Sequence, residues 1–236
     1  MTKPPGGARK PVGAVVVRGL KVLGVVLLLG GCTHFSKRSV TGACESNLDS
    51  GILNFCVVTP EVLWRGAELD PRGAAWLIQH GVRTIVNLEL THDDRSALIG
   101  ARIADLRKFE VNYFQLRNWQ PLALVAPALL DDRVARFIAI IARQPKPVYV
   151  HCLYGLDRTG VMIAAYRILV EGASEESAIE EMARYHEPWF RANARYLRGL
   201  VPERREKIRR EVLRLTPLLA SDARIVCERG DCRVAR

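Results

Sequence analysis

The feature that most constrains this chain is the stretch His-Cys-Leu-Tyr-Gly-Leu-Asp-Arg-Thr-Gly at positions 151–160. The apolar run before it, 147–150, predicts a short buried strand, and the apolar run after it, 161–166, predicts a buried helix. A loop between such elements directs backbone N–H groups and the positive end of the helix dipole toward one point, where an anion can bind. The same field favours the thiolate form of Cys152, and the planar guanidinium of Arg158 fits two oxygens of such an anion.

The spacing His-Cys-x5-Arg-Thr-Gly resembles the signature of the cysteine-dependent protein tyrosine and dual-specificity phosphatases. The resemblance implies phosphomonoester hydrolysis through a phosphocysteine intermediate, with Cys152 as the nucleophile and Arg158 holding the phosphoryl oxygens. It implies that His151 supports the thiolate and that the Thr159 hydroxyl stabilises it as a leaving group. No metal or other cofactor is expected. The expected substrate-binding residues are His151, Leu153, Tyr154, Gly155, Leu156 and Thr159.

The general acid that protonates the leaving oxygen is not evident from the motif. Better-known family members carry an aspartate about thirty residues before the cysteine, but here the corresponding stretch 116–121 contains no carboxylate. We expect Asp157 to be part of the site and Asp132 or Asp131 to be the acid. Each candidate could instead be a solvated residue at the start of a helix. The three alternatives are the pair Asp131 and Asp132, the loop residue Asp157, and the pair Asp93 and Asp94.

Strands and helices are expected to alternate along the chain. This alternation predicts an α/β fold with a central, mostly parallel sheet flanked by helices, of the dual-specificity type of protein tyrosine phosphatase. The basic helix at 203–215 is interpreted as a solvated face in preference to a surface for anionic lipid. Strands are expected at 62–67, 83–88, 111–116 and 147–150, and helices from 71, at 94–109, at 130–142, from 161, from 174 and at 203–215.

The segment 1–31 resembles a bacterial lipoprotein signal peptide. It has five basic residues and no acids, and its apolar run 22–29 is too short to span a bilayer. The sequence Leu-Gly-Gly-Cys at 29–32 resembles a lipobox, in which Cys32 is lipidated and becomes the mature N-terminus. Thr33 stands where a retained lipoprotein carries Asp, so the resemblance implies lipid anchoring at the periplasmic face of the outer membrane. A plain signal peptide or a short anchor is the alternative.

This organisation predicts a signal peptide at 1–31, a tether at 32–59, a phosphatase domain at 60–216 and a C-terminal tail at 217–236. Cleavage of the signal peptide would lower the net charge from +10 to +5, which suits an anionic substrate. In an oxidising periplasm the four cysteines other than Cys32 and Cys152 are expected to pair. We favour Cys44–Cys56 and Cys227–Cys232, which close short loops, over a bridge between the two ends of the domain.

The expected partners are the membrane, through Cys32, and a phosphorylated protein or a small phosphomonoester. No nucleic-acid-binding motif is evident, and the protein is not expected to bind nucleic acid. The loop residues Leu153, Tyr154 and Leu156 include no basic side chain, which favours phosphotyrosine over phosphoinositides. Two other functions stay open: a catalytically weak, phosphate-binding envelope lipoprotein, and a phosphoinositide or inositol phosphate phosphatase.

Overall fold

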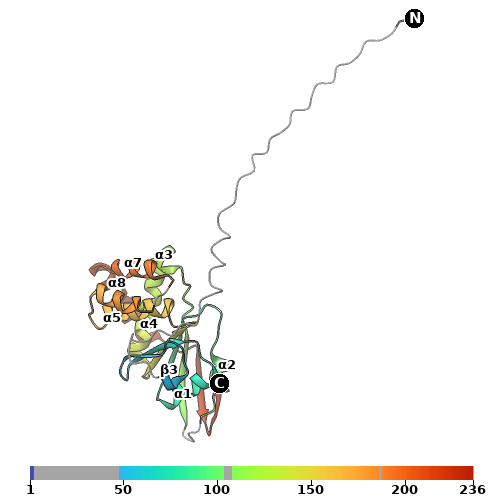
Figure 1. Cartoon of the computed structure of the whole chain (residues 1–236), viewed down its shortest axis with the longest axis vertical. Coiled ribbons are helices and arrows are strands. Elements are labelled where there is room, and N and C mark those ends of the chain that lie inside the picture. The colour runs from blue at the N-terminus through green and yellow to red at the C-terminus, as the bar shows by residue number, and fades with distance from the viewer. Residues whose placement is uncertain (3–47, 104–107, 186–187, 236) are drawn as a thin grey trace. The chain divides into compact units, whose positions relative to one another are not determined.

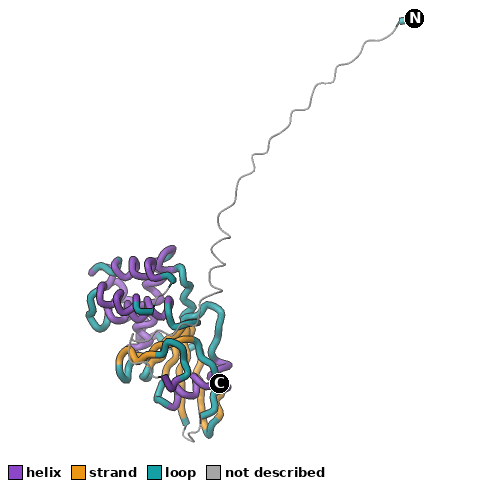
Figure 2. The backbone as a smooth tube through the Cα atoms, viewed as in Figure 1, coloured by secondary structure: helices purple, strands orange, loops and turns teal. Residues whose placement is uncertain are grey.

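The computed structural model describes residues 1–2, 48–103, 108–185 and 188–235. Its strands and helices lie in the compact unit that spans residues 37–236. Seven strands of the described chain form one sheet in the order β1-β2-β5-β3-β4-β6-β7 (Figures 1 and 2). The strands are β1 (Cys56–Thr59), β2 (Leu63–Ala67), β3 (Thr84–Asn87), β4 (Phe109–Gln115), β5 (Val148–Cys152), β6 (Ala223–Glu228) and β7 (Asp231–Val234).

The four central strands β2, β5, β3 and β4 run parallel, and each edge of the sheet is antiparallel. Helices cover both faces, so the predicted α/β class with a central sheet between helices is confirmed. The helices are α1 (Pro71–Gln79), α2 (Arg95–Gly100), α3 (Leu122–Val125), α4 (Pro127–Arg143), α5 (Asp157–Leu169), α6 (Glu175–Ala183), α7 (Phe190–Arg198) and α8 (Pro202–Leu215), with single 3-10 turns at Leu48–Ser50 and Thr216–Leu218.

Two apolar clusters pack on the two faces of the sheet. The larger one joins the sheet to helices α3 to α8, and the smaller one joins it to α1, α2 and the C-terminal hairpin. Figure 1 shows α1 and α2 apart from the group that contains α4, α5, α7 and α8. The side chains of β3 and β5 are buried along their whole length, because both strands lie in the middle of the sheet with helices on either side.

Local sequence explains where several helices begin. The Asp70 side chain accepts a hydrogen bond from the Gly73 N–H at 2.7 Å, and Pro71 occupies the first turn of α1, where its missing N–H has no cost. Ser174 caps α6 in the same way, as predicted, by accepting from the Ser177 N–H. These caps leave the turns between elements short and hold the helices close to the strands that they cover.

The segment 217–236 differs from the predicted tail. Strands β6 and β7 extend the sheet, and β6 pairs antiparallel with β4. Ile225 and Cys227 are buried in the cluster around α1 and α2, so this strand completes a core that the central strands leave open. The sequence of 217–236 does not predict these strands, because charged residues interrupt the short apolar pattern. Their pairing partner, β4, lies more than a hundred residues earlier in the chain.

The disulfide Cys227–Cys232 is present and joins two residues that face each other across the hairpin. This pair confirms one predicted bridge and excludes these cysteines from a bond to the N-terminal region. Cys56 is also disulfide-bonded, while its predicted partner Cys44 lies outside the described residues.

Two other expectations need correction. The predicted tether 32–59 includes β1 and the buried Phe55, which belong to the folded unit because they pack against β2 and α1. The predicted helix 94–109 ends at Gly100, because Ala101 and Ile103 continue as extended chain that packs beside the hairpin. The predicted leader and its Cys32 lie outside the described residues. Within the described ranges, no helix has the length and apolar character needed to cross a bilayer.

Candidate active site

Cys152 is the last residue of β5, and α5 begins five residues later at Asp157. Strands β2 and β3 flank β5 and end beside it, with Ala67 opposite Cys152 and Asn87 opposite His151. The Cys152 side chain is 3% exposed and is a free thiol. The carboxyl ends of three parallel strands and the N-terminus of a thirteen-residue helix therefore meet at one cysteine.

Donors from other segments hold the carbonyl groups of the loop. The Asn54 side-chain amide donates to the Tyr154 carbonyl at 2.9 Å, and the Glu68 N–H donates to the Leu153 carbonyl at 3.4 Å. The Arg65 guanidinium donates to the Gly155 carbonyl. Since C=O and N–H point in opposite directions across a trans peptide, these bonds direct the N–H groups of residues 154 and 156 to the other side of the loop. This arrangement is the one that an anion site requires.

Arg65 is a buried cation beneath the loop. Its side chain lies on β2, it is 1% exposed, and its guanidinium stacks 3.7 Å from the centre of the Tyr185 ring. A buried charge is costly unless it is paired, and the Gly155 carbonyl and the ring face partly compensate it. Sequence reasoning missed this role; the available signal was a single charged residue inside an otherwise apolar strand.

The buried pair of His151 and Asp94 lies directly behind the nucleophile. The Nε2 atom of His151 and Oδ2 of Asp94 are 2.7 Å apart, and both side chains are fully buried. Burial alone would lower the pKa of His151, but the Asp94 carboxylate outweighs it and the pKa is raised. Burial opposes the charged form of Asp94 as well, yet the charge of His151 lowers the pKa of Asp94. The Asp94 carboxylate therefore favours the imidazolium form of His151, the residue that precedes Cys152 in the chain.

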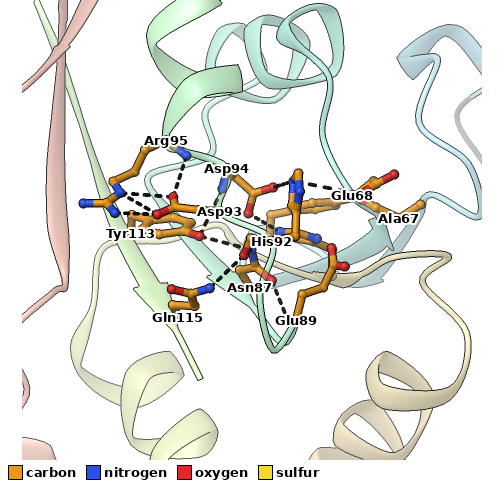
Figure 3. Close-up of polar contacts among 12 residues, drawn as sticks. Ala67, Glu68, Asn87, Glu89, His92, Asp93, Asp94, Arg95, Tyr113 and Gln115 are labelled. Atoms are coloured by element: carbon orange, nitrogen blue, oxygen red, sulfur yellow. Dashed lines mark hydrogen bonds and ion pairs between the residues drawn. The ribbon is translucent and has the colours of Figure 1, made fainter. Parts of the chain in front are cut away.

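The hydrogen-bond partner of His151 lies outside the loop, just before α2. Asp94 is positioned by its backbone N–H, which donates to the Tyr113 hydroxyl at 3.2 Å, and the Asn87 side chain donates to the same hydroxyl at 3.1 Å (Figure 3). Asp94 was one of the alternatives for the acid, and its bond to His151 makes it a supporting residue instead. Asp93, the other member of that pair, is bound to Arg95.

Asp131 and Asp132 are placed in the packing of α4 against α7 and α8. Asp131 is buried and accepts from the Tyr196 hydroxyl and from Nε of Arg204, each at 2.8 Å. Asp132 lines a separate cavity of about 250 Å³ between α4 and α8. Sequence proximity suggested either residue as the acid. In this geometry an ion pair and a hydroxyl occupy the Asp131 carboxylate, and the expectation that Asp131 supplies the proton stays a prediction.

Asp157 remains at the loop, at the first position of α5. Its Oδ1 atom accepts from the Trp189 N–H at 2.9 Å. Burial raises the pKa of Asp157, even though the Trp189 bond and the charge of Arg158 act in the opposite direction. Thr159 is fully buried, and its hydroxyl has no hydrogen-bond partner in the part of the chain that the structure describes.

Sequence reasoning also missed three residues that lie together beside the loop: Glu68, Glu89 and His92. Glu68 follows β2, Glu89 follows β3, and His92 lies before α2. Burial raises the pKa of Glu89, although the charges of His151 and Arg158 partly offset this effect. These side chains are the group near Cys152 that has the chemistry to hold a metal ion. No local motif announces them, since Glu68 and Glu89 are 21 residues apart.

Comparison with known proteins places this geometry in a family. Residues 56–194 match the model of a family described as "DSP-PTPase phosphatase fused to NAD+ Kinase". The chain is 30% identical over 172 residues to dual specificity protein phosphatase TpbA of Pseudomonas aeruginosa, covering 69% of this chain and 68% of that protein. It also matches 11% of the probable chloroplastic NAD kinase 2 of rice, at 29% identity over 113 residues.

Solved structures agree with the sequence matches. The crystal structure of P. aeruginosa TpbA aligns with a TM-score of 0.55 at 26% identity, covering 73% of this chain and 98% of that one. The catalytic core of the phosphatase SIW14 from S. cerevisiae aligns with a TM-score of 0.50 at 18% identity, which shows a shared fold. The chain belongs to the dual-specificity protein phosphatase family.

The loop geometry predicts opposite outcomes for two glycines with positive φ. Gly155 has a φ of 68°, and a Cβ there would collide with the carbonyl group of Gly66, whereas Gly172 has a φ of 74° and open space around it. We expect Gly155→Ala to abolish activity because the β5–α5 turn cannot keep its shape. Gly172→Ala, the matched control, should keep full activity and lose about 1 kcal/mol of unfolding free energy. Aryl phosphate hydrolysis and urea unfolding measure both. Full activity in Gly155→Ala would contradict this account of the loop.

Proposed function

We propose that this protein hydrolyses phosphomonoesters by transferring the phosphoryl group to Cys152. The observation that carries the proposal is a free, buried cysteine between the end of β5 and the start of α5, next to the His151–Asp94 pair. In this proposal the Cys152 thiolate attacks phosphorus while the bond to the leaving oxygen breaks. Arg158 and the loop N–H groups hold the three non-bridging oxygens as their charge redistributes.

Asp157 supplies the proton in the proposed reaction. Among the predicted candidates, Asp157 is the one that lies in the loop. Asp131, Asp93 and Asp94 are held in ion pairs, and Asp132 lines the cavity between α4 and α8. In the first step the protonated carboxyl gives its proton to the leaving oxygen. In the second step the carboxylate takes a proton from water, the water oxygen bonds to phosphorus, and the phosphorus–sulfur bond breaks to release phosphate and the thiolate. In this proposal the Thr159 hydroxyl, which has no hydrogen-bond partner in the described chain, stabilises that thiolate.

The substrate that we favour is phosphotyrosine in a protein. The loop side chains Leu153, Tyr154 and Leu156 carry no positive charge for additional phosphate groups. A solved form of P. aeruginosa TpbA is described as a complex with phosphotyrosine, which supports the same substrate here. A phosphoinositide would need basic side chains around the loop, and Glu68 and Glu89 have the opposite charge.

The nucleophile can be tested with the full chain and an aryl phosphate. We expect Cys152→Ser to lower kcat/KM by at least about 10³-fold, equivalent to about 4 kcal/mol of transition-state stabilisation. The variant should still bind inorganic phosphate, because Arg158 and the loop amides are unchanged. Equal turnover by Cys152→Ser would refute the phosphocysteine route. Phosphate binding by the unaltered protein without any turnover would favour the phosphate-binding alternative.

The role of Asp157 predicts a change in the pH profile. A general acid works in its protonated form, so the rate falls as pH rises through its pKa. Since burial raises the pKa of Asp157, the proton is kept to a higher pH than an exposed aspartate would allow. We expect Asp157→Asn to lower kcat by about 10²-fold and to remove the basic limb. Asp132→Asn is the control and should leave the profile unchanged. A basic limb that persists in Asp157→Asn and disappears in Asp132→Asn would reverse the assignment.

We further propose that the protein is lipid-anchored at Cys32 on the periplasmic side of the outer membrane. Support comes from the apolar run 22–29 and the Leu-Gly-Gly-Cys sequence that ends it. The anchor would hold a domain that has its own folded core. Loss of the anchor should therefore change where the protein is found and leave its catalytic activity intact. We expect Cys32→Ser to abolish labelling by a fatty-acid analogue, and Thr33→Asp to keep the label while moving the protein to inner-membrane fractions. Labelling that survives Cys32→Ser would contradict lipidation at this residue.

A further inference from the structure

Three metal-ligand side chains from separate segments meet beside the loop. Glu68 comes directly after β2, Glu89 comes two residues after β3, and His92 lies between β3 and α2. One ligand atom from each lies within 4.8 Å of the others, and Nε2 of His92 is 3.9 Å from Oε2 of Glu68. Figure 3 shows the ring of His92 between these carboxylates and that of Asp94.

Glu89 distinguishes this group from an ordinary acidic surface. The residue is 6% exposed, and its Oε1 atom is buried without a hydrogen-bond partner in the described chain. Buried carboxylate oxygens are normally hydrogen-bonded, since an unpaired one loses its hydration without compensation. The Nε2 atom of His92 is also buried without a hydrogen bond. Oδ1 of Asp94, which also lacks a hydrogen bond, lies 3.3 Å from that nitrogen, within ion-pair distance of a protonated His92.

We propose that Glu68, Glu89 and His92 bind a divalent transition-metal cation such as Zn²⁺. One imidazole nitrogen and two carboxylate oxygens are a ligand set that Zn²⁺ accepts, with a fourth position left open. Tetrahedral coordination puts neighbouring ligand atoms about 3.4 Å apart. The present spacings therefore need a small closure of the site. Glu68 and His92 are the residues that would supply it, because their side chains are 41% and 40% exposed, whereas Glu89 is buried.

The charges around Glu89 favour a cation as the ligand of this site. Glu68 and Glu89 supply two negative charges, and His151 and Arg158 on the neighbouring elements lie close enough to affect Glu89. Asp94 is bound through Oδ2 to His151, so its other oxygen can support His92 without leaving that pair. A divalent cation would compensate the buried Oε1 atom of Glu89, which has no hydrogen-bond partner in the described chain.

The site can be tested with Zn²⁺ alone, independently of any phosphatase activity. The full chain carrying Cys152→Ser is titrated by calorimetry, since this substitution removes the free thiol that would otherwise capture the metal. We expect the Cys152→Ser protein to show one Zn²⁺ site. Glu89→Gln and His92→Gln should each lower the Zn²⁺ affinity of this site at least about tenfold. His80→Gln is the matched control. His80 lies at the end of α1, bonded to the Trp76 carbonyl, and its substitution should change nothing.

A thermal-shift measurement gives a second readout. A cation that binds the folded state raises Tm, so Zn²⁺ should stabilise the Cys152→Ser protein and its His80→Gln derivative, but not the Glu89→Gln or His92→Gln derivatives. Glu89 is buried, so a Glu89→Gln protein that fails to fold would not report on Zn²⁺ binding. Glu68→Gln changes an exposed side chain, and this variant should fold and lose Zn²⁺ affinity. Zn²⁺ affinity that is unchanged in Glu68→Gln and His92→Gln, or no binding at all, would overturn the proposal. Either result leaves the Cys152 reaction untouched.

Discussion

The structure depends on how the short turn between β5 and α5 is held open. The turn consists of residues 153–156, and its Gly155 N–H donates to the Cys152 carbonyl at 3.3 Å. The carbonyl groups of residues 153 to 155 are bound from other segments. Asn54, Arg65 and the Glu68 N–H bind these carbonyls from outside. Gly155 adopts a positive φ so that the chain can pass next to Gly66. The parallel β2–β5 pairing brings these groups to the turn. The shape of the loop therefore depends on the order of the strands in the sheet.

Buried charge is concentrated around this turn. Arg65, His151 and Asp94 are all buried, and ion pairs at such depth contribute little net stability once desolvation is included. Their value lies in geometry and electrostatics. Arg65 is held by the Gly155 carbonyl in the turn, and His151, which precedes Cys152, is held by Asp94. Removing one partner would leave an uncompensated buried charge, which costs about 3–5 kcal/mol. The family relationship to dual-specificity phosphatases agrees with this use of charge, since these enzymes act on anionic substrates.

Prediction from the sequence succeeded where the determinants are adjacent in the chain. The loop 151–160, the flanking strand and helix, the alternation of β and α elements and the cap of α6 follow from patterns within a few residues. It failed at 94–109 and 217–236, where the decisive partners are distant: the hairpin β6–β7 both covers the chain after α2 and completes the sheet beside β4. Asp131 and Asp132 looked suitable as acids by position alone. Asp131 is bound by side chains of α7 and α8, and Asp132 lines the cavity between α4 and α8.

Strand, turn and helix signals act over a few residues, so sequence patterns alone were enough to predict the loop 151–160, its expected nucleophile Cys152 and the α/β class. Only the tertiary structure decided which side chains surround that loop. Arg65, Asp94, Glu68, Glu89 and His92 come from positions spread over the first half of the chain, and none belongs to a local motif. Parallel strands end at one edge of a sheet, so residues that follow β2, β3 and β5 become neighbours only when the strands pair. That pairing also made Glu89 a buried carboxylate beside the loop, which no spacing along the chain could indicate.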